Sequence, residues 1–212
     1  MVEGRREKVE GGHRMSRLRT PFRRAYPMHM AQRATRSLRT RAWTRADLAR
    51  LPDDGNRYEV LDGALLVTPQ AAFDHQEVAT RLAVALSAHC ATHQIGVVVA
   101  PGAIPHGKSE LQPDVQVIPG RPPRGAKWTS LPRPILVVEV LSDSTSRRDL
   151  GIKRDAYLRW GIPEYWVVDL DARCVHVFRV EAADGEVVDG TLIWRSAPSN
   201  APLELRVAEL FR

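Results

Sequence analysis

Residues 135–141 read Ile135-Leu-Val-Val-Glu-Val-Leu141, an uninterrupted apolar run that predicts a buried, central β-strand. Because side chains alternate along a strand, Glu139 shares a face with Ile135, Val137 and Leu141. A carboxylate on such a face costs several kcal/mol unless a cation compensates it. We therefore expect a lysine, an arginine or a metal ion beside Glu139. The alternative is that Glu139 lies at the strand end and faces solvent.

The segment that follows, from about Ser146 to Trp160, has the pattern of a helix. On a helical wheel Lys153 falls about 20° from Trp160, inside the apolar arc. Its ammonium should therefore point towards the sheet that holds Glu139, so that the two buried charges compensate each other. Asp149 offers a simpler alternative, because it precedes Lys153 by four residues and could form an ordinary ion pair along the helix.

A third candidate residue is Asp114, which follows Pro113 at the start of a predicted strand, residues 115–118. A Pro-Asp pair is common in turns, so the pair alone says little. The 25 residues that separate Asp114 from Glu139 are enough for one loop between neighbouring strands. The sequence therefore predicts that both carboxylates lie on adjoining strands.

The rest of the chain alternates between helical and strand patterns and contains no internal repeat. We expect one α/β domain with a mixed central β-sheet flanked by α-helices. The predicted helices are 44–50 and 74–92, the first opening on a Thr44-x-x-Asp47 signal and the second capped by Asp74; the predicted strands are 57–61, 64–67, 96–100, 164–169, 174–180, 191–195 and 203–207.

Charge divides the 212 residues unevenly. Residues 1–41 hold 12 Lys or Arg and three Asp or Glu, a net charge of +9, whereas residues 42–212 hold 19 and 22, a net charge of −3. The first segment lacks a sustained apolar period, so we predict a disordered basic extension, 1–41, before a folded domain, 42–212. The extension could be a nucleic-acid arm, a targeting segment or a tail without function. The folded domain itself is not basic, so its charge does not indicate nucleic-acid binding.

Cys90 and Cys174 lie far apart without CxxC spacing, so the sequence suggests neither a zinc cluster nor a disulfide framework. We expect a protein of the reducing cytoplasm. The longest apolar stretch, residues 82–105, is interrupted by histidines, a glycine and a proline, so we expect no membrane span.

Five stretches of the sequence resemble the Uma-two family within the PD-(D/E)XK nuclease superfamily, over roughly residues 43–180. The lysine is missing from its usual place, Leu141, and in that family it comes from the next helix, here Lys153. Asp143 stands where proline is usual in the family, which bears on the shape of a loop. The stretches are Tyr58-Glu-Val-Leu-Asp-Gly63, Gln112-Pro-Asp-Val115, Val138-Glu-Val-Leu-Ser142, Lys153 to Tyr157 and Gly161 to Asp169.

The resemblance implies a restriction-endonuclease-like core that cuts phosphodiester bonds, of DNA by expectation, with Mg²⁺ or Mn²⁺ as cofactor. It implies that the ion is bound by the carboxylates of Asp114 and Glu139 and the carbonyl of Val140, since hard cations prefer oxygen ligands. Lys153 would orient the attacking water and support developing charge. Glu59 would complete the acidic side, although a charged residue in a hairpin strand is often merely solvated.

Two further pairs of residues are candidates for substrate binding. His75 and Gln76 begin the long helix and could contact phosphate, or could simply cap the helix. Lys127 and Trp128 lie in a basic, proline-rich loop that could clamp nucleic acid or be merely solvated.

Two other functions stay open from the sequence. A non-catalytic relative could keep the fold to bind nucleic acid or a protein partner, although it would have no reason to keep Lys153 on an apolar face. An acid/base hydrolase could pair Glu59 with Glu139, but this would leave Lys153 without a role. A homodimer is expected by analogy with related nucleases.

Overall fold

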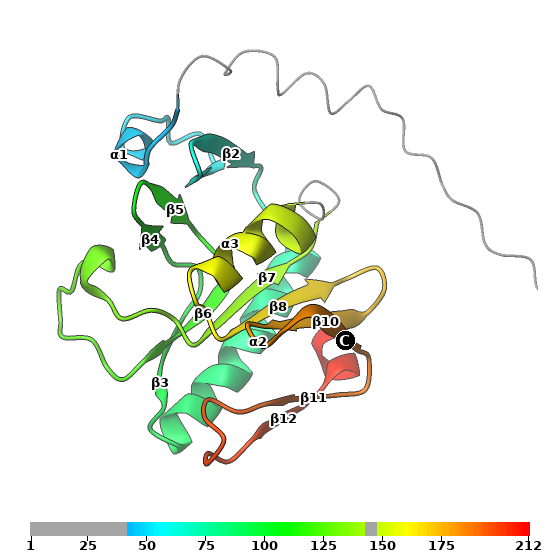
Figure 1. Ribbon diagram of the computed structural model, residues 1–212. Coiled ribbons are helices and arrows are strands. Elements are labelled where there is room, and N and C mark those ends of the chain that lie inside the picture. The colour runs from blue at the N-terminus through cyan, green and yellow to red at the C-terminus, as the bar shows by residue number, and fades with distance from the viewer. Residues whose placement is uncertain (1–41, 143–147) are drawn as a thin grey trace, which may run out of the picture. The chain divides into compact units, whose positions relative to one another are not determined.

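The structure, a computed structural model, describes residues 42–142 and 148–212. The predictions made for residues 1–41, for Asp143 and for a helix start at Ser146 concern residues outside these ranges and stay predictions. Of the three sheets formed by the described residues, the largest has the strand order β10-β9-β8-β7-β6-β3 (Figure 1). Its strands are β3 (Gly96–Val99), β6 (Val115–Pro119), β7 (Leu136–Val140), β8 (Glu164–Asp169), β9 (Cys174–Arg179) and β10 (Ala182–Val188).

The apolar run at residues 135–141 forms β7, and its predicted central position in the sheet is confirmed. All five residues of β7 are buried, and the strand lies between β6, to which it is antiparallel, and β8, to which it is parallel. The sheet is therefore mixed, as predicted. A parallel neighbour requires a crossover, and the helical segment between β7 and β8 supplies it.

Helices cover both faces of this sheet (Figure 1). The long helix α2 (Phe73–Thr92) packs against the face of β7 that carries Val138 and Val140, and the apolar stripe of α2, which includes Leu82, is buried. The opposite face carries Val137 and is covered by the shorter helix α3 (Arg154–Arg159). Glu139 lies on this second face because it is two residues from Val137.

The start of α2 corrects one prediction. The helix begins at Phe73 with Ala72 as its N-cap, so Asp74 lies inside the first turn and does not cap the helix. A carboxylate in a first turn still interacts favourably with the positive end of the helix dipole. Asp74 therefore does mark the start of the helix, but the helix begins one residue before it.

A second correction concerns the helix before β8. Its first part, η2 (Arg148–Lys153), is a π-helix, and only α3 is an α-helix. The 100° wheel therefore does not strictly apply to Lys153. The side chain nevertheless faces inward, with 2% of its surface exposed. Such π-helical turns are rare and occur often at functional sites.

The predicted hairpin at residues 57–67 lies outside the mixed central sheet, in a separate four-stranded sheet. In it β1 (Arg57–Leu61) pairs with both β2 (Ala64–Thr68) and β5 (Ser109–Leu111), and β5 pairs with β4 (Ile104–His106). The sequence analysis missed β4 and β5, whose three residues each are too few to show an alternating pattern. The small sheet packs on the α3 side of the large one and brings β1 close to it.

The remaining elements close the domain. The short helix α1 (Arg45–Leu48) has the predicted capping box between Thr44 and Asp47, with 2.9 Å from the Thr44 amide nitrogen to Asp47 Oδ2. The sequence analysis missed β10, but the two C-terminal strands it predicted are present as a separate pair. These are β11 (Thr191–Trp194) and β12 (Leu203–Arg206), and the 3-10 turns are η1 (Trp128–Ser130) and η3 (Val207–Phe211). Within the described ranges, every helix is too short or too polar to cross a membrane.

The core between α2 and the large sheet makes a stability prediction. Leu82 is 1% exposed, so Leu82→Ala should lower the free energy of unfolding by about 2–5 kcal/mol through lost burial and a residual cavity. Val84 on the same helix is 65% exposed, and Val84→Ala should change it by less than about 0.5 kcal/mol. Urea unfolding followed by circular dichroism measures both, and equal losses would contradict this placement of α2.

Candidate active site

The structure brings Lys153 from η2 into contact with two buried carboxylates. Its Nζ lies 2.9 Å from Glu139 Oε1 and 2.9 Å from Glu59 Oε2. None of the three side chains is more than 2% exposed. The contact depends on both sheets, because Glu139 lies on β7 and Glu59 on β1.

The alternative partner named from the sequence, Asp149, is present as well. Its Oδ1 lies 3.6 Å from Lys153 Nζ, and Asp149 is as buried as the lysine. This is therefore no ordinary surface ion pair but a third carboxylate in the same cluster. Tyr165 donates a hydrogen bond to the Asp149 carbonyl over 3.0 Å and holds this turn of η2 against β8.

A tyrosine that the sequence analysis did not propose for the site also binds Glu139. The Tyr157 hydroxyl donates to Glu139 Oε1 over 3.0 Å, so the same oxygen accepts from both Tyr157 and Lys153. Burial, together with the nearby charge of Glu139, raises the pKa of Tyr157 well above its usual value, which keeps it a donor. The helical wheel could have indicated Tyr157 as a site residue, because it places Tyr157 one turn after Lys153 on the same inward face.

Asp114 lies just before β6, next to the end of β7. The Val140 amide donates to Asp114 Oδ2 over 2.8 Å, so the predicted adjacency of Asp114 to the central strand is present in the structure. Asp114 is 6% exposed. Burial alone would raise its pKa, but the hydrogen bond from His75 and the charge of Arg57 outweigh burial and hold the pKa well below its usual range.

Arg57 and His75 bind Asp114 from two other elements. Arg57 Nη1 lies 2.7 Å from Asp114 Oδ1, and His75 Nε2 lies 3.1 Å from Oδ2. Arg57 begins β1 and shares the face of Glu59, two residues later. The sequence analysis proposed His75 but missed Arg57, for which the only signal was this period-two relation to Glu59.

Glu59 also fixes the loop that leads to Asp114. Its Oε1 accepts a hydrogen bond from the Gln112 amide over 2.7 Å, and its other oxygen faces Lys153. Glu59 is fully buried. It therefore connects the lysine to the segment just before Pro113 and Asp114, a structural function that the sequence did not reveal.

A cavity of about 190 Å³ opens beside this cluster. Asp114 contributes to its lining, as do Arg57, His75, Gln76 and Ser142. Glu59, Glu139 and Lys153 are buried and do not line it. A ligand in the cavity would therefore reach Asp114 first.

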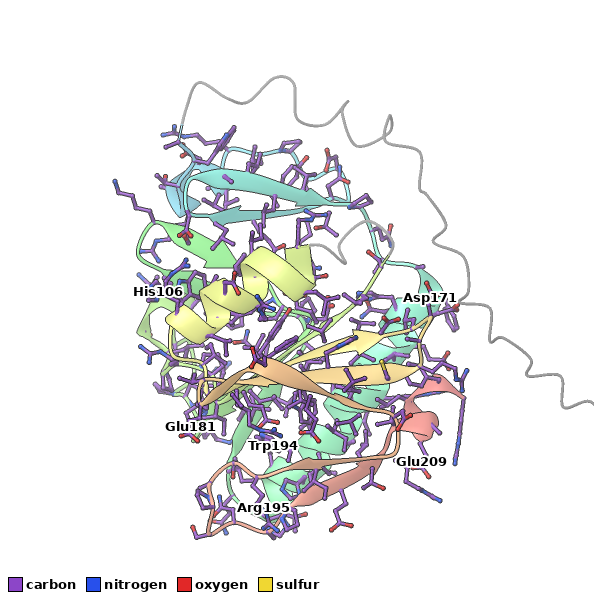
Figure 2. The ribbon with its side chains drawn as sticks, turned by 45° about the vertical axis from the view of Figure 1, so that its right-hand side comes forward. His106, Asp171, Glu181, Trp194, Arg195 and Glu209 are labelled. Atoms are coloured by element: carbon purple, nitrogen blue, oxygen red, sulfur yellow. The ribbon has the colours of Figure 1, made fainter. Side chains whose placement is uncertain are left out.

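The structure separates Lys127 and Trp128 from this cavity. Trp128 is 41% exposed and lines a different cavity of about 220 Å³ together with Gln116 and Trp160. His106, labelled in Figure 2, stacks on Trp160 with ring centroids 4.7 Å apart. His75 and Gln76, in contrast, line the cavity at Asp114.

The charges of the cluster do not balance. Among the described residues of the cluster, the permanent cations are Lys153 and Arg57; burial lowers the pKa of each, but the carboxylates outweigh burial and raise both above their usual values. Burial raises the pKa of Glu139 well above its usual value; Lys153 opposes this and Asp114 adds to it. Buried acids therefore outnumber the permanent cations among the described residues of the cluster. Its four carboxylates are Glu59, Asp114, Glu139 and Asp149.

This imbalance fits a divalent cation with oxygen ligands. In the part of the chain that the structure describes, no three of these carboxylates bring ligand atoms within 4.8 Å of one another, so the cluster is no all-protein cage. Mg²⁺ is usually bound by one or two carboxylates, with water and substrate phosphate as further ligands. The donor set, with Asp114 at the cavity and Glu139 behind it, suits such an ion.

Comparison with known proteins identifies a solved structure with a similar fold. No curated protein matches the chain. Among solved structures, the chain is similar to one titled "Crystal structure of a putative nuclease belonging to DUF820 from Anabaena variabilis ATCC 29413", with a TM-score of 0.65 and 20% identity over 79% of this chain and 97% of that one. This likeness confirms the predicted α/β fold with a mixed sheet.

A family match confirms the resemblance seen in the motifs. The model of the Uma2 family, described as "Putative restriction endonuclease", matches residues 45–206. This range contains the whole buried cluster, from Arg57 to Tyr157, and most of the folded domain. The chain therefore belongs to the Uma2 family.

Proposed function

We propose that this protein is a divalent-metal-dependent endonuclease that hydrolyses phosphodiester bonds of DNA. The observation that carries the proposal is the buried, negatively charged cluster in which Lys153 bridges Glu139 and Glu59 beside Asp114. Membership in a family described as restriction endonucleases supports nuclease activity. DNA as substrate and the need for a metal are the finer parts of the proposal.

We assign the metal, Mg²⁺ or Mn²⁺, to the carboxylates of Asp114 and Glu139 and the carbonyl of Val140. Oε1 of Glu139 already accepts from Lys153 and Tyr157, so Oε2 is the ligand atom we assign. Each oxygen of Asp114 has two lone pairs and can bind an ion while still accepting from a protein donor. When bound, the ion would lower the pKa of a coordinated water and neutralise charge on the scissile phosphate.

Lys153 has two tasks in this proposal. Its ammonium fixes the orientation of Glu139 and favours the ionised form of this carboxylate, the form that binds a metal. Its third proton can orient the attacking water, and its positive charge supports the negative charge that develops on the phosphate. Glu59 holds Lys153 in place for both tasks, and so does Asp149.

Arg57, His75 and Gln76 are the groups we assign to substrate binding, because they line the cavity at Asp114. Arg57 carries a permanent charge in a planar group that matches phosphate oxygens. Trp128 lines another cavity, and neither Lys127 nor Trp128 lines the cavity at Asp114, so we assign them no contact with the reacting phosphate.

Two further parts of the proposal concern the setting of the protein. A duplex has two strands to cut, so we propose that the enzyme acts as a homodimer with one site for each strand. Cys90 and Cys174 are both free thiols, which suits the reducing cytoplasm that we propose as its location.

Cleavage assays test the proposal directly. The full-length protein should cut DNA only with Mg²⁺ or Mn²⁺. Because even partners of metal ligands contribute about 10–100-fold, Asp114→Asn should lower the cleavage rate by at least that much. Asp155 is an exposed acid on α3 that contacts Arg154, and Asp155→Asn should cut at the wild-type rate. Supercoiled, linear and single-stranded DNA and RNA are compared as substrates.

Three outcomes of these assays would count against the proposal. Cutting without a metal, or by Asp114→Asn at the wild-type rate, would refute the mechanism. Cutting of RNA alone would refute the assigned substrate. No cutting of any substrate, with DNA binding retained in fluorescence anisotropy, would favour the non-catalytic binding module.

The bridging function of Lys153 makes a separate prediction about stability. Lys153→Met leaves Glu139 and Glu59 buried without their cation and should lower the free energy of unfolding by about 3–5 kcal/mol at pH 8. The loss should shrink towards pH 5, because a carboxylate whose folded-state pKa is raised takes up a proton on folding, and this favours the folded state at lower pH.

Arg154 provides the matched control, since it follows Lys153 directly but is partly exposed and pairs with Asp155. Arg154→Met should cost less than about 1 kcal/mol at either pH. Denaturant unfolding of both variants at pH 5 and pH 8 measures the difference. A loss in Lys153→Met that is the same at both pH values would contradict the assignment.

A further inference from the structure

A second group of ligand-type side chains lies at the hairpin between β8 and β9, outside the cluster around Lys153. Asp169 ends β8, Cys174 begins β9 as its cross-strand partner, and His176 follows two residues later on the same face. One donor atom from each lies within 4.8 Å of the others, and among the described residues no other three do so. Figure 2 labels Asp171 in the turn that joins the two strands.

The distances between these donor atoms are close to those of a tetrahedral metal site. Cys174 Sγ lies 3.9 Å from His176 Nε2, and His176 Nε2 lies 3.9 Å from Asp169 Oδ2. Tetrahedral Zn²⁺ with sulfur, nitrogen and oxygen ligands separates such atoms by about 3.4–3.6 Å. These two separations therefore need to close by only a few tenths of an ångström, and the donor atoms of Cys174 and Asp169 lie within 4.8 Å of each other.

Local contacts hold the ligands in this arrangement. Asp169 Oδ1 accepts a hydrogen bond from the Ala172 amide over 2.8 Å, which directs Oδ2 towards His176. The ring of His176 is stacked on that of Phe178, with 7° between their planes. Two of the three ligands are thus oriented without a metal, so binding would cost little conformational entropy.

The electrostatic surroundings also favour a cation. The carboxylates of Asp169 and Asp189 place negative charge near the Cys174 sulfur. The neighbouring basic side chain, Arg173, points elsewhere: it donates to the Phe211 carbonyl and lies over the Phe211 ring. The acids at this end of the hairpin therefore receive no compensation from Arg173.

We propose that Asp169, Cys174 and His176 form a binding site for Zn²⁺, with water as the fourth ligand. A thiolate and an imidazole select a borderline or soft metal over Mg²⁺, so the site is chemically distinct from the oxygen-rich cluster at Asp114. Binding releases the thiol proton to solvent as the sulfur–zinc bond forms. The ion would crosslink β8 and β9 at the hairpin end. β8 is the parallel neighbour of β7, the strand that carries Glu139.

Cobalt titration tests the site. Co²⁺ substitutes for Zn²⁺ in tetrahedral sites and shows a thiolate-to-metal charge-transfer absorption when sulfur is a ligand. The untagged full-length protein should develop this band, Cys174→Ser should not, and Cys90→Ser should resemble the wild type because Cys90 lies on α2. Absence of the band from the wild type, or its persistence in Cys174→Ser, would overturn the proposal.

A second measurement does not depend on the cysteine variants. Zn²⁺ at about a hundredfold excess over its Kd should raise the melting temperature by roughly 5–10 °C. His176→Ala and Asp169→Asn alter side chains that are about a quarter exposed, so both should fold normally and bind Zn²⁺ at least about tenfold more weakly.

The active-site variant separates this proposal from the nuclease. Asp114→Asn should respond to Zn²⁺ as the wild type does, whether or not the protein cuts DNA, and Mg²⁺ should give no comparable rise in this variant, which lacks the carboxylate assigned to Mg²⁺. An equal rise with Zn²⁺ in wild type, His176→Ala and Asp169→Asn would place the ion elsewhere and overturn the proposal.

Discussion

The buried ammonium of Lys153 is the interaction on which the rest of the site depends. It joins η2 to β7 through Glu139 and to β1 through Glu59, so three segments that are distant in the sequence meet at one charge. Burying such ions costs several kcal/mol each, and a well-packed apolar replacement is often as stable or more stable. The cluster is therefore a poor way to stabilise a fold. It is better understood as a device that holds carboxylates in a fixed orientation next to a cavity.

Periodicity predicted the parts of this cluster that one segment can show by itself. Glu139 interrupts an apolar run, and Lys153 lies on an apolar helix face. The partners that come from β1 could not be found in this way, because Arg57 and Glu59 reach the site only through the pairing of β1 with β5. The partner strand, β5, has only three residues, which leave no alternating pattern. The π-helical form of η2 was also beyond a wheel that assumes α-helical spacing.

The group of Asp169, Cys174 and His176 at the β8–β9 hairpin also could not be recognised from patterns within a single segment. Cysteine spacing alone suggests no zinc site, since Cys174 has no second cysteine nearby in the sequence. The ligands are joined by strand register, which makes Asp169 the partner of Cys174, and by the period of two that brings His176 to the same face. Spacing rules taken from compact zinc motifs cannot recognise a group assembled across a sheet, although each of its residues is plain in the sequence.

Charge places a final constraint on how a nucleic acid would bind. Residues 42–212 carry a net charge of −3, and the cavity leads to Asp114 beside further buried acids, so the folded domain offers phosphate no general attraction. Arg57 is the permanent cation that lines this cavity, and it is already paired with Asp114. A bound divalent ion would relieve the repulsion and release part of Arg57 for the phosphate. In the proposed nuclease the ion would therefore be needed to bind the substrate as well as to cut it, so that affinity and cleavage depend on metal together.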